Sequence, residues 1–154
     1  MNKNRYLVHA ASIAAVYAVL TIAFAPLSYG QIQIRFAEAL TILPFFTSAA
    51  IPGLFAGCIV ANFFGPGGML DVVFGSVATL IAAYISYKMP TKWLVPLPPV
   101  IANGVIIGYL LHYLYHLPLL ITIGWVALGE LISCYFIGYP LLLILEKYRD
   151  RIFR

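Results

Sequence analysis

Five long stretches of the chain carry no charged side chain, and this feature constrains the fold more than any other. The fourteen charged residues leave residues 6–34, 39–70, 72–87, 93–129 and 131–145 uncharged. A membrane-spanning helix needs roughly 20 consecutive, mostly apolar residues, because the hydrocarbon core of a bilayer is about 30 Å thick. The pattern therefore predicts an all-α membrane protein.

The composition excludes several classes of protein. Charged residues make up 9% of the 154-residue chain, whereas a soluble domain carries about 25%. So few charges cannot cover a globular surface, which argues against a soluble enzyme, a nucleic-acid partner or a disordered chain. We expect membrane lipid to surround the protein, and we treat its nine basic residues as markers of topology rather than of a nucleic-acid site.

Clusters of Gly and Pro divide the apolar stretches into six expected spans, which we interpret as one integral membrane domain over residues 1–154. The spans cover residues 6–26, 37–46, 50–64, 69–87, 93–113 and 119–147. The second is too short to cross by itself, so it is either a tilted or partial span or an element packed against other helices.

The basic residues predict the orientation of this six-helix bundle. Lys3 and Arg5 place the N-terminus in the cytoplasm, and six spans return the basic residues of 147–154 to the same side. The lysines of residues 88–92 also fall inside, so eight of nine basic residues are cytoplasmic and Arg35 alone is outside. We expect a multi-pass protein of the cell membrane with both termini in the cytoplasm.

A few polar residues lie within or beside the spans, where an ionisable group costs on the order of 2.5–3.5 kcal/mol at mid-bilayer. These candidate binding residues are Arg35, Glu38, Asn62, Asp71, Asn103 and Glu130. Glu130 is the deepest, roughly 16 Å below the start of the sixth span at 1.5 Å per residue. Together they indicate a ligand pocket that opens toward the outside.

Five of these six residues also have a structural alternative. Arg35 and Glu38 could pair with each other at a helix start, and Asp71 could interact with a helix dipole. The two asparagines could form hydrogen bonds between helices. Only Glu130, deep and far from any basic residue in sequence, has no simple structural role.

The sequence contains no metal, cofactor or disulfide motif. His112 and His116 have no third ligand close in sequence, and the two cysteines lie mid-span without flanking ligands, so we expect packing roles. Because no phosphate-binding Gly-rich motif is present, ATP would have to be used by a partner chain. We also expect no enzyme activity, because the chain shows no nucleophile–base pair.

The loop between the first two spans alternates polar and apolar residues. Gln31, Gln33 and Arg35 alternate with isoleucines and Phe36, which favours an extended segment with one polar face. We interpret this segment, with Tyr29, as a lid over the pocket mouth; the alternative is an amphipathic loop on the membrane surface.

The first span carries two rows of small residues at a spacing that lets another helix approach closely. Ala10, Ala14 and Ala18 form one row, and Ala11 and Ala15 the other. These rows could bind a partner helix or pack within the bundle. Gly53 with Gly57, and Gly104 with Gly108, are interpreted as internal packing.

Four blocks of the sequence, residues 33–45, 51–62, 70–76 and 129–135, resemble the queuosine-precursor transporter family. Members of that family are substrate-binding S components of energy-coupling factor (ECF) transporters. The resemblance implies a six-helix membrane subunit that captures its ligand near the outer face under the first loop. It also implies that the alanine rows dock onto a transmembrane coupling protein, which carries two cytoplasmic ATPases.

The candidate residues suit a 7-deazaguanine such as preQ1, preQ0 or queuine. A carboxylate matches the two adjacent donors of a guanine-like edge, and a cationic aminomethyl group needs a second carboxylate, because a buried unpaired charge is costly. We assign Glu130 and Glu38 to the base edge or the amine, Asp71 and Asn62 to support, and Arg35 to a lid or carbonyl contact. Two alternatives stay open: an S component for another vitamin-like compound, and a standalone proton-coupled carrier. An intramembrane enzyme is the least favoured.

Overall fold

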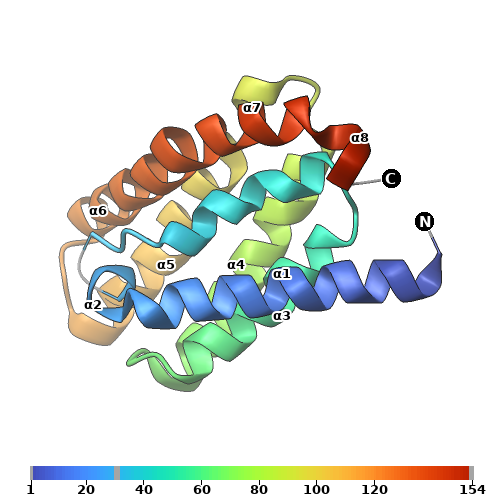
Figure 1. The fold of residues 1–154 in the computed structure, drawn as a ribbon. Helices are drawn as coiled ribbons and strands as arrows, with labels where there is room; N and C mark the ends of the chain where they lie inside the picture. The colour runs from blue at the N-terminus through green and yellow to red at the C-terminus, as the bar shows by residue number, and fades with distance from the viewer. Residues whose placement is uncertain (1, 30–31, 153–154) are drawn as a thin grey trace.

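In a computed structural model the chain consists of helices joined by short loops (Figure 1). The structure describes residues 2–29 and 32–152, and no strand occurs within these ranges. Four helical segments are long and apolar enough to cross a membrane: Lys3–Ala23 (α1), Gly68–Lys88 (α4), Lys92–Tyr115 and Leu119–Lys147. The segment Lys92–Tyr115 consists of a short 3₁₀ turn, η2 (Lys92–Leu94), followed by the helix α5 (Leu97–Tyr115). The prediction of an all-α membrane protein is confirmed.

Two further apolar helices are too short to span a bilayer. The 3₁₀ helix η1 (Phe36–Phe45) has ten residues and is about 20 Å long, and α3 (Ala50–Phe63) has fourteen and is about 21 Å long. Both are shorter than the roughly 30 Å of hydrocarbon. Four of the six expected spans therefore form helices long enough to cross a bilayer. The other two are too short to do so, and the predicted count of six spanning helices is not confirmed. Most of η1 is buried, as expected of an element that packs against its neighbours.

The last span is one continuous helical segment with a change of winding in its middle. It begins as α6 (Leu119–Leu131), continues as a π-helix, η3 (Ile132–Gly138), and ends as α7 (Tyr139–Lys147), followed by the short α8 (Arg149–Ile152). Short π-helical turns within α-helices are rare and are often found at functional sites. Here the π-helix begins two residues after Glu130.

Glycines bring the helices into close contact. A Cβ added at Gly53 or Gly57 of α3 would lie 2.7 Å from a backbone carbonyl of α1. One added at Gly108 of α5 would lie 2.7 Å from the backbone of α6, and one at Gly104 would lie 3.1 Å from the side chain of Ala127. Both glycine pairs therefore serve internal packing, as the sequence predicted.

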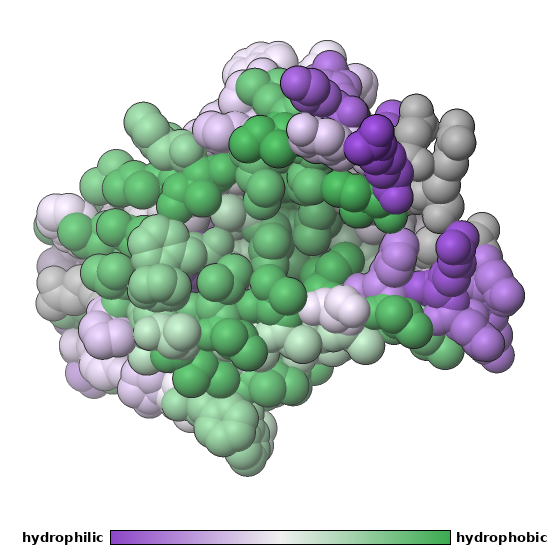
Figure 2. Space-filling view, viewed as in Figure 1, coloured by the Kyte–Doolittle hydropathy of each residue, from purple (hydrophilic) through white to green (hydrophobic). Residues whose placement is uncertain are grey.

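The surface divides into an apolar body and a polar end. Figure 2 shows hydrophobic residues over most of the visible face and hydrophilic residues gathered where the chain begins and ends. Both termini lie at this end, and α2 (Ala25–Ser28) lies at the opposite end (Figure 1). An apolar body suits contact with lipid. The side of the membrane that the polar end faces stays a prediction.

Candidate binding site

The structure brings the six candidate residues into one buried region, although they come from five different segments. All six are at most 6% exposed. They form two groups: the carboxylate pair, which is Glu38 and Glu130 with Asn103 beside it, and the Arg35–Asp71 ion pair with Asn62 beside it.

The carboxylate pair joins η1 to the end of α6. The Tyr17 hydroxyl of α1 donates a hydrogen bond to Oε1 of Glu38. The Asn103 amide of α5 donates to Oε1 of Glu130 at 3.0 Å and also interacts with Glu38. The Cys134 thiol lies 3.6 Å from Oε2 of Glu130. Two carboxylates from distant parts of the sequence thus share one amide.

No basic side chain pairs directly with these two carboxylates: Arg35 lies within electrostatic range of both, but it forms its ion pair with Asp71. Among residues 2–29 and 32–152, neither Glu38 nor Glu130 forms an ion pair. Oε2 of Glu38 also has no hydrogen-bond partner in the described part of the chain. Because an isolated buried carboxylate is costly, the pair is suited to bind either protons or a cation.

Arg35 pairs with Asp71 across the bundle rather than with Glu38 nearby in sequence. The Arg35 and Asp71 side chains approach to 3.7 Å, and Nε of Arg35 donates to the Ser28 carbonyl at 3.2 Å. The guanidinium also lies 5.4 Å from the centre of the Tyr29 ring. Burial alone would lower the pKa of Arg35, but nearby acidic groups outweigh burial and raise that pKa, so the side chain stays a cation.

Asn62 joins α3 to the start of α4. Its amide nitrogen donates to the Asp71 carbonyl at 3.0 Å and approaches the Cys58 sulfur to 3.4 Å. Gly75 makes room for this amide, since a Cβ there would lie 2.4 Å from the nitrogen. The predicted hydrogen bonding between helices is therefore present. The amide oxygen of Asn62, however, has no partner among the described residues.

The lid loop places its polar side chains inward. Gln33 and Arg35 are buried, whereas Ile32 is exposed and Ile34 and Phe36 are half-buried, so the polar side chains of this segment face inward. Its role as a lid stays a prediction. The extended path is interrupted at Gln33, whose φ is +44°. Gln31, also assigned to the lid, lies outside the described residues. The loop rests on α6 at Gly129, where an added Cβ would lie 1.7 Å from the Ile32 carbonyl oxygen.

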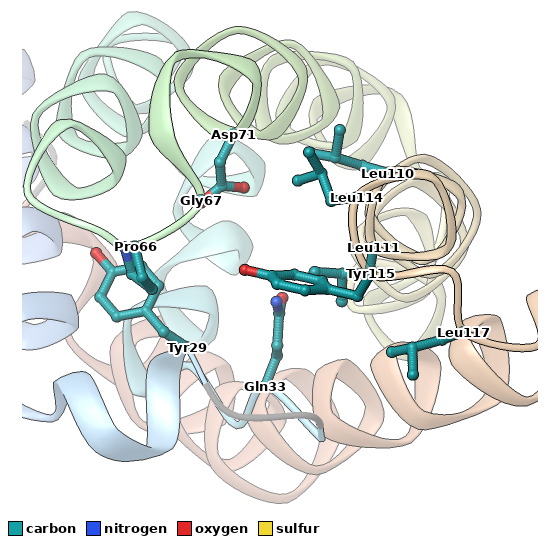
Figure 3. Close-up of a pocket in the computed structure, with 10 residues that line it drawn as sticks. All are labelled: Tyr29, Gln33, Pro66, Gly67, Asp71, Leu110, Leu111, Leu114, Tyr115 and Leu117. Atoms are coloured by element: carbon teal, nitrogen blue, oxygen red, sulfur yellow. The ribbon is translucent and has the colours of Figure 1, made fainter.

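A cavity of about 310 Å³ has Asp71, the only one of the six candidate residues to line it, in its wall (Figure 3). This is at the lower end of the range for small-molecule sites, roughly 300–1,000 Å³. Asp71, Gln33 and Tyr115 point their polar atoms toward its centre in Figure 3. Its full lining is Tyr29, Gln33, Pro66, Gly67, Asp71, Leu110, Leu111, Leu114, Tyr115 and Leu117.

Comparison with known proteins identifies the family. A family profile described as the QueT transporter matches residues 7–147. The chain belongs to the QueT transporter family. This is the queuosine-precursor transporter family that its sequence blocks resemble. No curated protein and no solved structure matches the chain.

Membership of the QueT transporter family makes this chain a membrane transport protein, which agrees with its four spanning helices. Within the described ranges, no three His, Cys, Asp or Glu side chains are arranged to hold a metal ion. Cys58 and Cys134 are buried free thiols. They do more than fill space, because each contacts a candidate binding residue.

The alanine rows of this QueT family chain lie on different faces of α1. Ala18 is buried, and the backbone carbonyls of Ala10 and Ala14 face the glycines of α3. Ala11 and Ala15 are exposed. The first row therefore takes part in internal packing, and the second row is the one left open to another helix.

Sequence reasoning missed three residues of this site. Cys134 follows Glu130 by one helical turn, a spacing that could have revealed it. Tyr17 is the one fully buried tyrosine of α1, but nothing in its neighbourhood distinguishes it from the other aromatic residues. Tyr115 lines the cavity and is the last residue of α5, and the next residue, His116, has a left-handed φ of +53°. Pro118, three residues after Tyr115, was a sequence signal for this helix end. The ring of Phe36, which the sequence assigned to the lid, packs edge-on against the ring of Phe24, with the two ring centres 4.7 Å apart.

Proposed function

We propose that this chain is the substrate-binding S component of an ECF-type importer and that it captures a queuosine precursor of the 7-deazaguanine class. Its ligand is a planar base with several hydrogen-bond donors, and the aminomethyl form, preQ1, suits the site best. The chain itself needs no cofactor. It has six membrane-embedded elements, of which η1 and α3 are shorter than the bilayer.

The observation that supports the proposal is the charge balance of the buried region. Three carboxylates, Glu38, Asp71 and Glu130, lie together with one cation, Arg35, and that cation is paired with Asp71. The carboxylate pair therefore lacks a counter-ion of its own. A monocationic ligand supplies one, and charge-assisted hydrogen bonds to carboxylates are about twice as strong as neutral ones.

The remaining polar groups suit the edge of a guanine-like base. Such an edge presents an N–H and an NH₂ side by side, which a carboxylate accepts in a bidentate manner. Its carbonyl accepts from a guanidinium, and Arg35, paired with Asp71 of the cavity wall, provides one. The unpartnered amide oxygen of Asn62 accepts one further donor. The ligand enters through the cavity and passes the Arg35–Asp71 ion pair to reach the carboxylate pair.

Energy comes from partner chains in this proposal. The exposed row of Ala11 and Ala15 on α1 docks on a transmembrane coupling protein, which carries two cytoplasmic ATPases. The polar end of the molecule, with both termini, faces the cytoplasm of the cell, following the positive-inside rule. The cavity at the other end then faces outward.

The test is equilibrium binding by the purified chain in detergent. The ligands are preQ1, preQ0, queuine and a set of vitamins, including thiamin. We expect the deazaguanines to bind at least tenfold more tightly than any vitamin, and Glu130→Gln to weaken preQ1 most. Preferred binding of a vitamin, or undiminished binding of preQ1 by Glu130→Gln, would refute the assignment.

Co-purification separates the importer from a standalone carrier. An S component retains a coupling protein and ATPases when it is isolated from its native membrane. Uptake by the chain alone, in vesicles that contain no other transport protein, would support the proton-coupled carrier instead.

A further inference from the structure

The carboxylate pair has an electrostatic consequence that deepens the proposed function and rests on it. The titratable and charged groups around the pair come from every neighbouring element. Those that act on the pair directly are Tyr17 on α1, Arg35 before η1, Cys58 on α3 and Cys134 on η3, and Asp71 on α4 faces Arg35. Arg35 is the one cation among these described groups, and it is already paired with Asp71 at 3.7 Å.

A net charge in this region is unfavourable. Glu38 is fully buried and Glu130 is 2% exposed, so water screens neither carboxylate effectively. With the Arg35–Asp71 pair neutral, two ionised glutamates would leave two uncompensated negative charges. Like charges that share a buried site also oppose each other's ionisation. The arrangement of lowest charge holds a proton on each glutamate.

The hydrogen bonds leave room for both protons. Tyr17 donates to Oε1 of Glu38, and Oε2 of Glu38 has no partner among the described residues. Asn103 donates to Oε1 of Glu130. The Cys134 thiol lies 3.6 Å from Oε2 of Glu130 and also 3.6 Å from the Glu38 carbonyl oxygen, so the thiol has a second acceptor when Oε2 carries a proton. Each carboxyl group thus keeps one oxygen as an acceptor and has a second oxygen that can carry the proton.

We propose that the chain exchanges one proton for each cationic ligand that it binds. The ammonium group of the ligand takes a position beside the carboxylate pair, one glutamate loses its proton to solvent, and the region stays neutral before and after binding. No bond other than O–H breaks in this step. A neutral ligand in the same place releases no proton.

The exchange gives the two ligand types different pH dependence. By linkage, the affinity for a cation rises about tenfold for each pH unit, as long as the free protein holds the proton and the ligand stays charged. The affinity for a neutral base stays constant over the same range. The site therefore selects between aminomethyl and nitrile deazaguanines according to pH.

Isothermal titration calorimetry of the purified full-length chain tests the exchange. Binding of preQ1 and of preQ0 is measured at one pH in phosphate and in Tris, whose heats of protonation differ, so the difference in observed enthalpy gives the number of protons released. We expect one proton for the cationic preQ1 and none for the neutral preQ0. Equal proton numbers for the two ligands, or none for preQ1, would overturn the inference while leaving the proposed function intact. No binding of preQ1, preQ0 or queuine would instead refute the proposed function and this inference with it.

Two variants add a check that does not depend on ligand choice. Glu146→Gln removes a surface carboxylate that pairs with Lys92. This control variant should still release one proton when it binds preQ1. The double variant with Glu38→Gln and Glu130→Gln should release none and should bind preQ0 more tightly than preQ1. If the double variant still released a proton with preQ1, another group would be the source and the inference would be wrong. If the double variant does not fold, the comparison of the two ligands with the unaltered chain decides the question.

Discussion

The contact between the lid loop and α6 leads to a sharp prediction for Gly129→Ala. An added Cβ would lie 1.7 Å from the Ile32 carbonyl oxygen, and real Cβ contacts are essentially never shorter than 3.0 Å. The loop must therefore move by at least 1.3 Å, the difference between these distances. Overpacking of this kind costs about 1–3 kcal/mol. In the free variant the displaced loop relieves this strain, whereas the bound state needs Gln33 and Arg35 in their original places. Binding then carries the cost of returning the loop, so we expect preQ1 affinity to fall by about 5- to 150-fold.

Gly124→Ala provides a matched control within the same helix. A Cβ at Gly124 meets nothing within 4 Å, so this variant gains only helix propensity, at most about 1 kcal/mol. We propose to measure preQ1 binding and the thermal unfolding midpoint of both variants in one detergent. Gly129→Ala should lose affinity, and Gly124→Ala should keep its affinity and unfold at the same or a slightly higher temperature. Equal affinities for the two variants would show that the lid loop does not rest on Gly129 when ligand binds.

Three further predictions concern separate parts of the molecule. Tyr17→Phe leaves a buried oxygen of Glu38 without its donor, so unfolding should become easier by about 1–3 kcal/mol in thermal denaturation; an unchanged midpoint would contradict the hydrogen bond. Ala15→Leu adds bulk to the exposed alanine row of α1. It should abolish preQ1 uptake in cells without changing preQ1 binding by the purified chain, whereas intact uptake would exclude docking through this row. Glu146→Gln breaks an exposed ion pair with Lys92, whose atoms are 2.6 Å apart, and should change the free energy of unfolding by less than about 1 kcal/mol in the same assay. A larger loss would mean that this ion pair stabilises the polar end of the molecule.

The scarcity of charge made much of this site predictable from sequence. A soluble protein contains too many charged residues for any one to stand out, whereas Glu38, Asp71 and Glu130 interrupt apolar runs and require an explanation. The structure brings these three together with Arg35 in one buried region. The inward-facing polar side of the loop before η1 could also be predicted, because side chains of an extended segment alternate between its two faces with a period of two residues.

Other features depend on tertiary contacts that no local pattern encodes. The pairing of Arg35 with Asp71 joins residues 36 positions apart, so the nearer Glu38 was an equally reasonable partner on sequence grounds. The 3₁₀ winding of η1 and the π-helix after Glu130 reflect packing inside the bundle. The role of Ala10 and Ala14 was ambiguous, because small residues permit close approach by an internal helix as readily as by a partner.

The central claim is that the carboxylate pair binds the amine of a cationic deazaguanine. A structure of the chain with preQ1 bound tests this most directly, through the distances from the ligand's ammonium nitrogen to Glu38 and Glu130. We predict a separation of about 2.7–2.9 Å from at least one of these carboxylates, the range of a charge-assisted hydrogen bond. An ammonium group held only in the outer cavity, beside Asp71 and Tyr115 and without contact to either glutamate, would contradict the account.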